Sequence, residues 1–145
     1  IYGEGSLRRE LETRIEQLGL QKRVMLPGAK DGIQEFIKDA SLFVLSSDYE
    51  GIPNALIEAM AIGLPCVSTD CSPGGARELI NNDVSGVIVP RGDSSELTQQ
   101  MIRLLVDREF AKKIGCKALD VRIRTDKSII VDAWIQVFNC GRDKI

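Results

Sequence analysis

The chain has 145 residues, of which 43% are hydrophobic and 28% charged, as expected of one globular domain. Its formal net charge of −2 argues against the strongly basic face that nucleic-acid binding requires. The absence of histidine excludes histidine-based catalytic triads and histidine metal sites. No apolar run approaches the roughly 20 residues of a transmembrane helix, and no signal-peptide pattern opens the sequence.

The first elements suggest a strand, a helix and a second strand. Residues 1–6 are typical of a strand end that runs into a glycine turn, and Ser6 is a candidate N-cap for a helix that stops at Gly19. Residues 24–26 predict a short buried strand closed by a Pro-Gly turn. Because the chain begins at the last residues of a strand, we expect it to be a piece of a longer protein.

Strand and helix patterns then alternate along the rest of the chain. Strands are expected at 42–45, 66–68 and 86–89, and helices at 33–39, 53–62, 75–80, 109–119 and 127–139. A further helix is capped by Asp93 or Ser94, and its inner face is expected to comprise Leu97, Met101, Leu104 and Leu105. The last helix carries an apolar stripe from Ile130 to Phe138, which we expect to pack against the protein.

The four cysteines are scattered along the sequence, at positions 66, 71, 116 and 140. They form neither a CxxC pair nor a zinc-ligand cluster. We therefore expect them to act as small hydrophobic side chains in a reducing cytosol.

Short apolar strands that alternate with helices predict an α/β fold, in which a parallel sheet of five short strands is covered by helices on both faces. This is a Rossmann-like, three-layer arrangement. Ligands bind such sheets outside the carboxyl ends of the strands. The loops that follow the strands are therefore the places to search for a site.

The loop after residues 42–45 carries the most information. Gly51 permits a tight backbone, and the helix that follows offers free N–H groups around residues 54–56, which form an anion site. Glu50 precedes this helix and Glu58 lies in its second turn. Because carboxylates accept hydrogen bonds from sugar hydroxyls, this arrangement suits a diphosphate flanked by a ribose and a hexose.

At this point the sequence resembles a known family. Residues 50–54, 58–60 and 63–67 are similar to the glutamate pair, separated by seven residues, of the group 1 retaining glycosyltransferases. Weaker motifs of the same family follow in order at 3–5, 24–28, 40–43, 74–80 and 85–89. The resemblance implies a GT-B fold of two Rossmann-like domains. Residues 1–145 would then be a single nucleotide-sugar-binding domain, the C-terminal half of a larger two-domain enzyme.

The resemblance also implies roles for individual residues. Glu50 would be the catalytic-site carboxylate that faces the donor hexose, and Glu58 would accept hydrogen bonds from the ribose hydroxyls. The backbone that contacts the hexose and diphosphate would be that of Gly51, Ile52, Pro53, Asn54, Ala55 and Leu56. The turn after residues 24–26, around Ala29 and Lys30, would hold the edge of the base, with Ile33 near the face of the base. The family is metal-independent, so neither a cofactor nor a metal is expected.

The resemblance implies that the chain binds a nucleotide-sugar, UDP-linked before GDP-linked, for retaining transfer of a hexose in bacterial surface polysaccharide or glycolipid synthesis. The acceptor, a glycan or lipid-linked glycan, would bind the missing N-terminal domain, and no nucleic-acid partner is expected. In the family, an Arg and a Lys that neutralise the diphosphate lie upstream of Ile1, so the isolated fragment should be almost inactive. The full-length protein would be cytoplasmic, or peripheral at the inner membrane face.

Two alternatives stay open. A GT-B-type sugar-nucleotide epimerase would need catalytic acids and usually a histidine. A non-catalytic nucleotide-binding module, such as a receiver, would need clustered acids at its strand ends, where only Asp48 and Asp70 lie. Two glycine motifs also remain ambiguous. The 3–5 turn lacks the third glycine of a dinucleotide site, and Gly74-Gly75 suits either a cleft lining or a helix cap.

Overall fold

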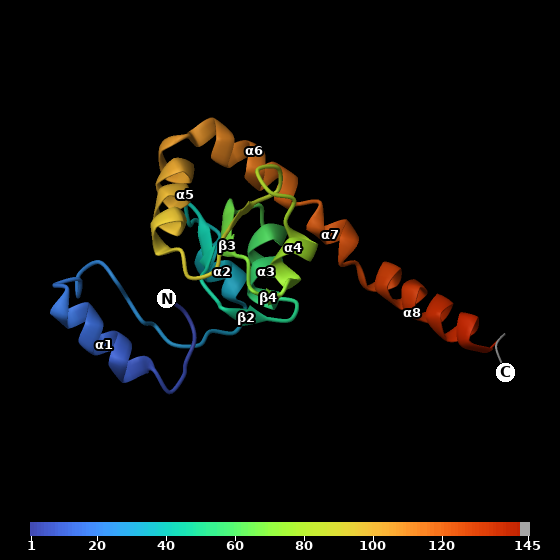
Figure 1. The fold of residues 1–145 in the computed structure, drawn as a ribbon, viewed down its shortest axis with the longest axis horizontal. Coiled ribbons are helices and arrows are strands. Elements are labelled where there is room, and N and C mark those ends of the chain that lie inside the picture. The colour runs from blue at the N-terminus through green and yellow to red at the C-terminus, as the bar shows by residue number, and fades with distance from the viewer. Residues whose placement is uncertain (143–145) are drawn as a thin grey trace. The chain divides into compact units, whose positions relative to one another are not determined.

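The computed structural model describes residues 1–142 and divides into two compact units, Ile1–Phe36 and the chain from Ile37 onward. Figure 1 follows the elements from α1, in blue, to α8, in red. Within residues 1–142, no helix combines the length and the apolar character needed to cross a bilayer.

The first unit holds one longer helix and two extended segments. α1 (Arg8–Gln17) follows Leu7 as its N-cap residue and no side chain caps it, so the expected cap at Ser6 is wrong. The two strands expected here reduce to one parallel bridge between Tyr2 and Gly28. One bridged pair is shorter than the shortest usual strand, so residues 1–2 and 24–26 do not extend the sheet. The short helix α2 (Ile33–Ile37) lies at the boundary of the units.

The second unit is built on a three-stranded parallel sheet. Its strands are β1 (Phe43–Leu45), β3 (Cys66–Thr69) and β5 (Val87–Val89), in the order β1-β3-β5. All four residues of the central strand β3 are buried, as expected in a doubly covered sheet, although two of them, Ser68 and Thr69, are polar. A second pair, β2 (Tyr49–Glu50) and β4 (Ser72–Pro73), was not expected; these strands are also parallel, with Glu50 opposite Pro73.

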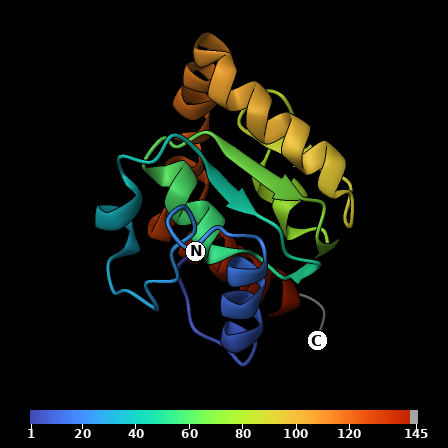
Figure 2. The same ribbon diagram turned by 90° about the vertical axis from the view of Figure 1, so that its left-hand side faces the viewer.

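Helices cover both faces of this sheet, which confirms the α/β fold. Figure 2 shows α5 (Ser94–Val106) and α6 (Arg108–Ala118), in yellow and orange, on one face and α3 (Asn54–Ala61), in green, on the other. Asp93 caps α5 by accepting a hydrogen bond from the Glu96 N–H at 2.9 Å, as the capping pattern predicts. The remaining helices are α4 (Gly75–Leu79), α7 (Val121–Arg124) and α8 (Lys127–Arg142).

One hydrophobic cluster of the core lies between the sheet and the helices α5 and α6. It comprises Val67, Val87, Val89, Leu104, Ala111 and Ile114. The expected inner face of α5 is correct for Leu104, which is 2% exposed, but wrong for Leu105, which is 46% exposed. Leu97 packs against the core and Met101 is half-buried.

The apolar stripe of α8 does not pack as expected. Its large apolar side chains between Ile129 and Phe138 are 43–65% exposed. Within α8 the rings of Trp134 and Phe138 stack on each other, with their centroids 5.8 Å apart.

Two of the cysteines behave as small core residues and one does not. Cys66 and Cys71 are buried, whereas Cys116 is exposed on α6, so the expectation of burial fails there. Burial raises the pKa of the Cys66 thiol to about 12, because the thiolate would lose its hydration. The side chain of Cys140 lies outside the described residues.

Candidate functional site

The loop between β1 and α3 forms the centre of the candidate site. It leaves the carboxyl end of β1, pairs with β4 through β2, and enters α3 through Gly51, Ile52 and Pro53. Each parallel strand of the main sheet ends at this same edge, where ligands bind in open α/β sheets. The candidate loop therefore lies at the edge of the sheet where the order of strands and helices predicts a ligand site.

The N-terminus of α3 has two unpaired N–H groups. Pro53 is the N-cap residue, and its carbonyl accepts from the N–H groups of Leu56 at 3.1 Å and Ile57 at 3.2 Å. No side chain caps the helix, and within residues 1–142 the N–H groups of Asn54 and Ala55 donate to no protein acceptor. Free N–H groups together with the helix dipole make this end attractive to an anion.

The two predicted carboxylates flank that helix end along the chain, and both are half-buried. Glu50 accepts a hydrogen bond from the Ser47 hydroxyl at 3.0 Å. Glu58 lies on α3 close in sequence to Leu56, Ala59 and Met60, all buried, and it has no hydrogen-bond or ion-pair partner in the described chain. A partly buried carboxylate is costly without a partner, so Glu58 is available for a ligand donor.

The predicted backbone contacts differ in accessibility. Gly51, Ile52, Asn54 and Ala55 are exposed, whereas Pro53 is buried. Leu56 is also fully buried, and its N–H is already bonded inside the first turn. The exposed groups are therefore the ones a ligand can reach directly.

The three residues predicted to hold a base lie in the first unit. Ala29 is exposed and Ile33 is half-buried. The Lys30 ammonium lies 5.8 Å from the centre of the Phe36 ring, within the range of a cation–π contact. Lys30 thus has a protein partner besides solvent.

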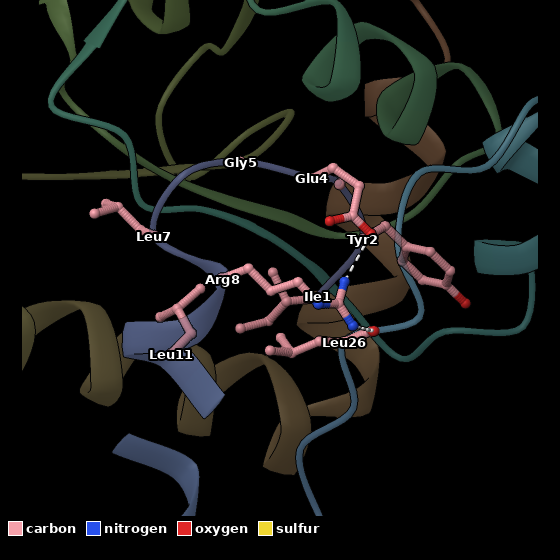
Figure 3. Close-up of a pocket in the computed structure, with 9 residues that line it drawn as sticks. Ile1, Tyr2, Glu4, Gly5, Leu7, Arg8, Leu11 and Leu26 are labelled. Carbon is pink, nitrogen blue, oxygen red and sulfur yellow. Dashed lines mark hydrogen bonds and ion pairs between the residues drawn. The ribbon is translucent and has the colours of Figure 1, made fainter. Parts of the chain in front are cut away.

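The turn at residues 3–5 is used for an ion-pair network. Figure 3 shows the Arg8 guanidinium beside Glu4 and the Leu26 carbonyl, with distances of 2.7 and 2.9 Å. Arg8 also donates to Glu12 at 2.9 Å, and the hydrogen bond with Glu4 is the main cause of its raised pKa. A cavity of about 210 Å³ adjoins this network, and its lining is largely apolar. These contacts give Glu4 and Arg8 a structural role, because they hold α1 against the extended segments of the first unit.

The second glycine motif supports the candidate loop directly. Gly75 lies so close to Gly51 that a Cβ on Gly75 would be 1.4 Å from the Gly51 carbonyl oxygen. A cavity of about 410 Å³ adjoins this contact, and it is lined by Gly51, Ile52, Pro73, Gly74, Gly75, Arg77 and Glu78. The sequence alone does not decide whether Gly74-Gly75 lines a cleft or caps a helix, because a single sequence does not show that the backbones at Gly75 and Gly51 lie close together.

Arg77 is held beside this cavity by an acidic partner. Its guanidinium makes a two-point ion pair with Asp70, the residue after β3, and this hydrogen bonding raises the pKa of Arg77. Because Asp70 already offsets the charge of Arg77, we interpret the pair as structural. The two hydrogen bonds fix the orientation of the guanidinium beside the cavity. Within residues 1–142, no three His, Cys, Asp or Glu side chains are grouped to hold a metal ion.

The profile of the family described as "Glycosyl transferases group 1" matches residues 1–120. The chain belongs to this family. It is 42% identical to the amylovoran biosynthesis glycosyltransferase AmsK of Erwinia amylovora over 112 residues, which cover 72% of this chain and 27% of AmsK. The chain thus spans about a quarter of the length of that relative.

Solved structures of similar proteins agree with the fold. A Staphylococcus aureus TarM variant, in complex with fondaparinux, alpha-GlcNAc-glycerol and UDP, matches 96% of this chain with a TM-score of 0.87 and 28% identity. Anabaena HepE, in complex with UDP-glucose, matches 91% with a TM-score of 0.83 and 27% identity. The matches cover 28% of the TarM chain and 36% of the HepE chain.

These comparisons confirm two predictions from the sequence. The chain belongs to the group 1 glycosyltransferases, and its structural neighbours are GT-B glycosyltransferases. Membership of the family favours a transferase over the receiver-like module and the epimerase. The match also spans both units of the structure, since residues 1–120 extend from the first strand segment to the end of α6.

Proposed function

We propose that this chain is the donor-binding part of a retaining glycosyltransferase that uses a UDP-hexose in bacterial surface polysaccharide or glycolipid synthesis. The observation that carries the proposal is the α3 N-terminus, whose free Asn54 and Ala55 N–H groups lie between two half-buried carboxylates along the chain. The UDP and UDP-glucose in the TarM and HepE complexes, and the amylovoran pathway of AmsK, support the donor and the pathway.

Each part of a nucleotide-sugar would have its own partner. The N–H groups of Asn54 and Ala55 would donate to diphosphate oxygens, where the helix dipole adds to the attraction. Glu58 would accept from the ribose hydroxyls and Glu50 from a hydroxyl of the hexose. Ala29, Lys30 and Ile33 would contact the base, as the family motif implies.

The transfer that follows from this assignment breaks one bond and forms one. The acceptor hydroxyl attacks the anomeric carbon on the face from which the diphosphate leaves, and the bond from that carbon to the diphosphate oxygen breaks. The acceptor proton passes to a diphosphate oxygen, so UDP is released with the charge balanced. The α3 N–H groups would stabilise the negative charge that develops on the diphosphate, which is a large part of such catalysis.

The rest of the proposal concerns the longer protein. The acceptor glycan or lipid-linked glycan would bind a preceding domain, and the 145-residue piece alone would transfer almost nothing. The full protein would work in the cytoplasm or at the inner membrane face. Transfer would need no metal ion, so EDTA should leave its rate unchanged.

The test is calorimetric titration of the complete protein with UDP, GDP and ADP, in the wild type and in Glu58→Ala. Charge-assisted hydrogen bonds contribute roughly 1.5–3 kcal/mol, so the substitution should weaken UDP binding about 10- to 100-fold. Glu109→Ala is the matched control, since Glu109 is an exposed glutamate in the first turn of α6. It should leave UDP affinity unchanged.

Two outcomes would contradict the proposal. If Glu58→Ala leaves the affinity for UDP unchanged, the nucleotide binds away from α3. A complete protein that binds ADP or GDP in preference to UDP would contradict the UDP-hexose assignment.

A further inference from the structure

Two hydrogen bonds link Glu50 to the central strand of the sheet, through Ser47 and Thr69. The Ser47 hydroxyl donates to Glu50 Oε1 at 3.0 Å, and both residues are half-buried. The other carboxylate oxygen of Glu50, Oε2, accepts no hydrogen bond from the described residues. One oxygen is therefore held by the protein and the other is left for a ligand.

Ser47 is itself fixed from the central strand. The Thr69 hydroxyl donates to the Ser47 carbonyl oxygen at 2.5 Å, and Thr69, the last residue of β3, is only 5% exposed. The same hydroxyl lies 3.4 Å from the carbonyl of Leu45, where β1 ends. Because β3 runs between β1 and β5, Ser47 is tied to the most buried strand of the sheet.

The backbone at Glu50 is restrained independently of these hydroxyls. Glu50 pairs with Pro73 in the β2–β4 ladder, and the next residue, Gly51, is in close backbone contact with Gly75. With the backbone set, the remaining freedom of Glu50 is that of its own side-chain rotamers. The Ser47 hydrogen bond favours one of these rotamers before a ligand binds.

An exposed loop glutamate gains little from such restraint, because water hydrates its carboxylate in any rotamer. A carboxylate that must meet a sugar hydroxyl in one direction gains from it, since binding then no longer has to order the side chain. We propose that Ser47 is a positioning residue that holds Glu50 with Oε2 free for a hydroxyl of the donor hexose, and that Thr69 holds Ser47. This inference rests on the proposed function, in which Glu50 contacts the hexose.

The test uses the complete protein and donor hydrolysis, measured as UDP release without acceptor. The donor is whichever of UDP-glucose, UDP-galactose and UDP-N-acetylglucosamine is hydrolysed fastest. Ser47→Ala should lower kcat about tenfold, the effect of losing one hydrogen bond to a charged group, and leave UDP affinity within about twofold. Ser47→Thr keeps the hydroxyl and should restore most of the rate. Ser41→Ala, at an exposed serine before β1, is the control.

A double-mutant cycle separates positioning from a general structural role. In a Glu50→Ala background, Ser47→Ala should lower the rate no further, because the group that it orients is gone. Equal losses in both backgrounds, or no loss on Ser47→Ala in the wild type, would overturn the inference. If Glu50→Ala itself leaves hydrolysis unchanged, the role of Glu50 in the proposed function fails, and this inference fails with it.

Thr69 provides a second, independent measurement. Thr69→Val keeps the size of the buried side chain and removes its hydroxyl, whereas Thr69→Ser keeps the hydroxyl. We expect a lower rate for Thr69→Val than for Thr69→Ser, again at unchanged UDP affinity. Equal rates for the two variants would refute the link between Thr69 and Ser47.

Discussion

Replacing Gly75 with alanine tests whether the backbone of α4 sets the position of the candidate loop. The new Cβ would lie 1.4 Å from the carbonyl oxygen and 2.6 Å from the carbonyl carbon of Gly51. Ordinary contacts of this kind begin near 3.4 Å, so the two backbones must separate by about 2 Å. No flexible side chain can absorb this shift, because both obstructing atoms are backbone.

The expected cost has a stability part and a functional part. Overpacking of this kind lowers the free energy of unfolding by about 1–3 kcal/mol. A displacement of even about 1 Å in a positioned loop can cost about 100-fold in rate. We therefore expect Gly75→Ala to lower kcat/KM for donor hydrolysis at least about 100-fold in the fraction that remains folded.

The matched control is Gly115→Ala on α6. A Cβ at Gly115 would lie 2.3 Å from the carbonyl oxygen of Gly63, beyond the C-terminal end of α3 and so away from the N-terminal end where we propose that the donor binds. This variant should lose stability, measured by urea unfolding, but keep the kcat/KM of the folded protein. Wild-type stability and wild-type kcat/KM in Gly75→Ala would refute the reasoning, because the close approach to Gly51 would then not exist.

Two further predictions concern stability and thiol chemistry. Asp93→Ala should lower the free energy of unfolding by about 1 kcal/mol, because it removes the side chain that accepts from the Glu96 N–H. Asp93→Ser should recover most of this loss. Identical urea midpoints for the wild type and Asp93→Ala would contradict the role of Asp93 as a cap. Cys116 should react with iodoacetamide at pH 8 in the folded protein while Cys66 stays unmodified, as mass spectrometry of digests would show. Since the folded pKa of Cys66 is raised to about 12 from 9.0, its contribution to stability is complete below about pH 9 and is lost as the pH rises toward 12. The free energy of unfolding should therefore fall less steeply over that range in Cys66→Ala than in the wild type, and equal slopes would contradict the shift.

The sequence predicts those elements whose signal is local. The strands β1 and β5 are short apolar runs and β3 begins with one, and turn residues bound all three. α5 carries both its periodicity and its cap at Asp93. The pair Glu50 and Glu58 could be identified because both flank a recognisable helix start. In the structure Glu50 ends β2, before α3, and Glu58 lies within α3, while their binding roles stay predictions.

The features that the sequence did not predict depend on the three-dimensional path of the backbone, and most of them join segments that are distant in the sequence. β2 and β4 are two-residue strands without periodicity, and only their mutual pairing defines them. The Ser47–Glu50 hydrogen bond and the close approach of Gly75 to Gly51 likewise arise from the path of the backbone. The stripe on α8 shows the opposite failure, because helical periodicity predicts an apolar face but not what covers it.

The first unit has a thermodynamic consequence of its own. Among residues 1–36 only Gly28 is buried, and α1 has no buried residue, so this unit is held mostly by exposed contacts, among them the Arg8 network, the Tyr2–Gly28 bridge and the contact between the Tyr2 and Phe36 rings. Opening it exposes little new apolar surface, and its backbone amides should exchange with solvent deuterium at a small fraction of the global unfolding free energy. Because Ala29, Lys30 and Ile33 lie in this unit, a nucleotide that contacts them would slow that exchange. Ligand binding would then be recorded as deuterium protection of the first unit.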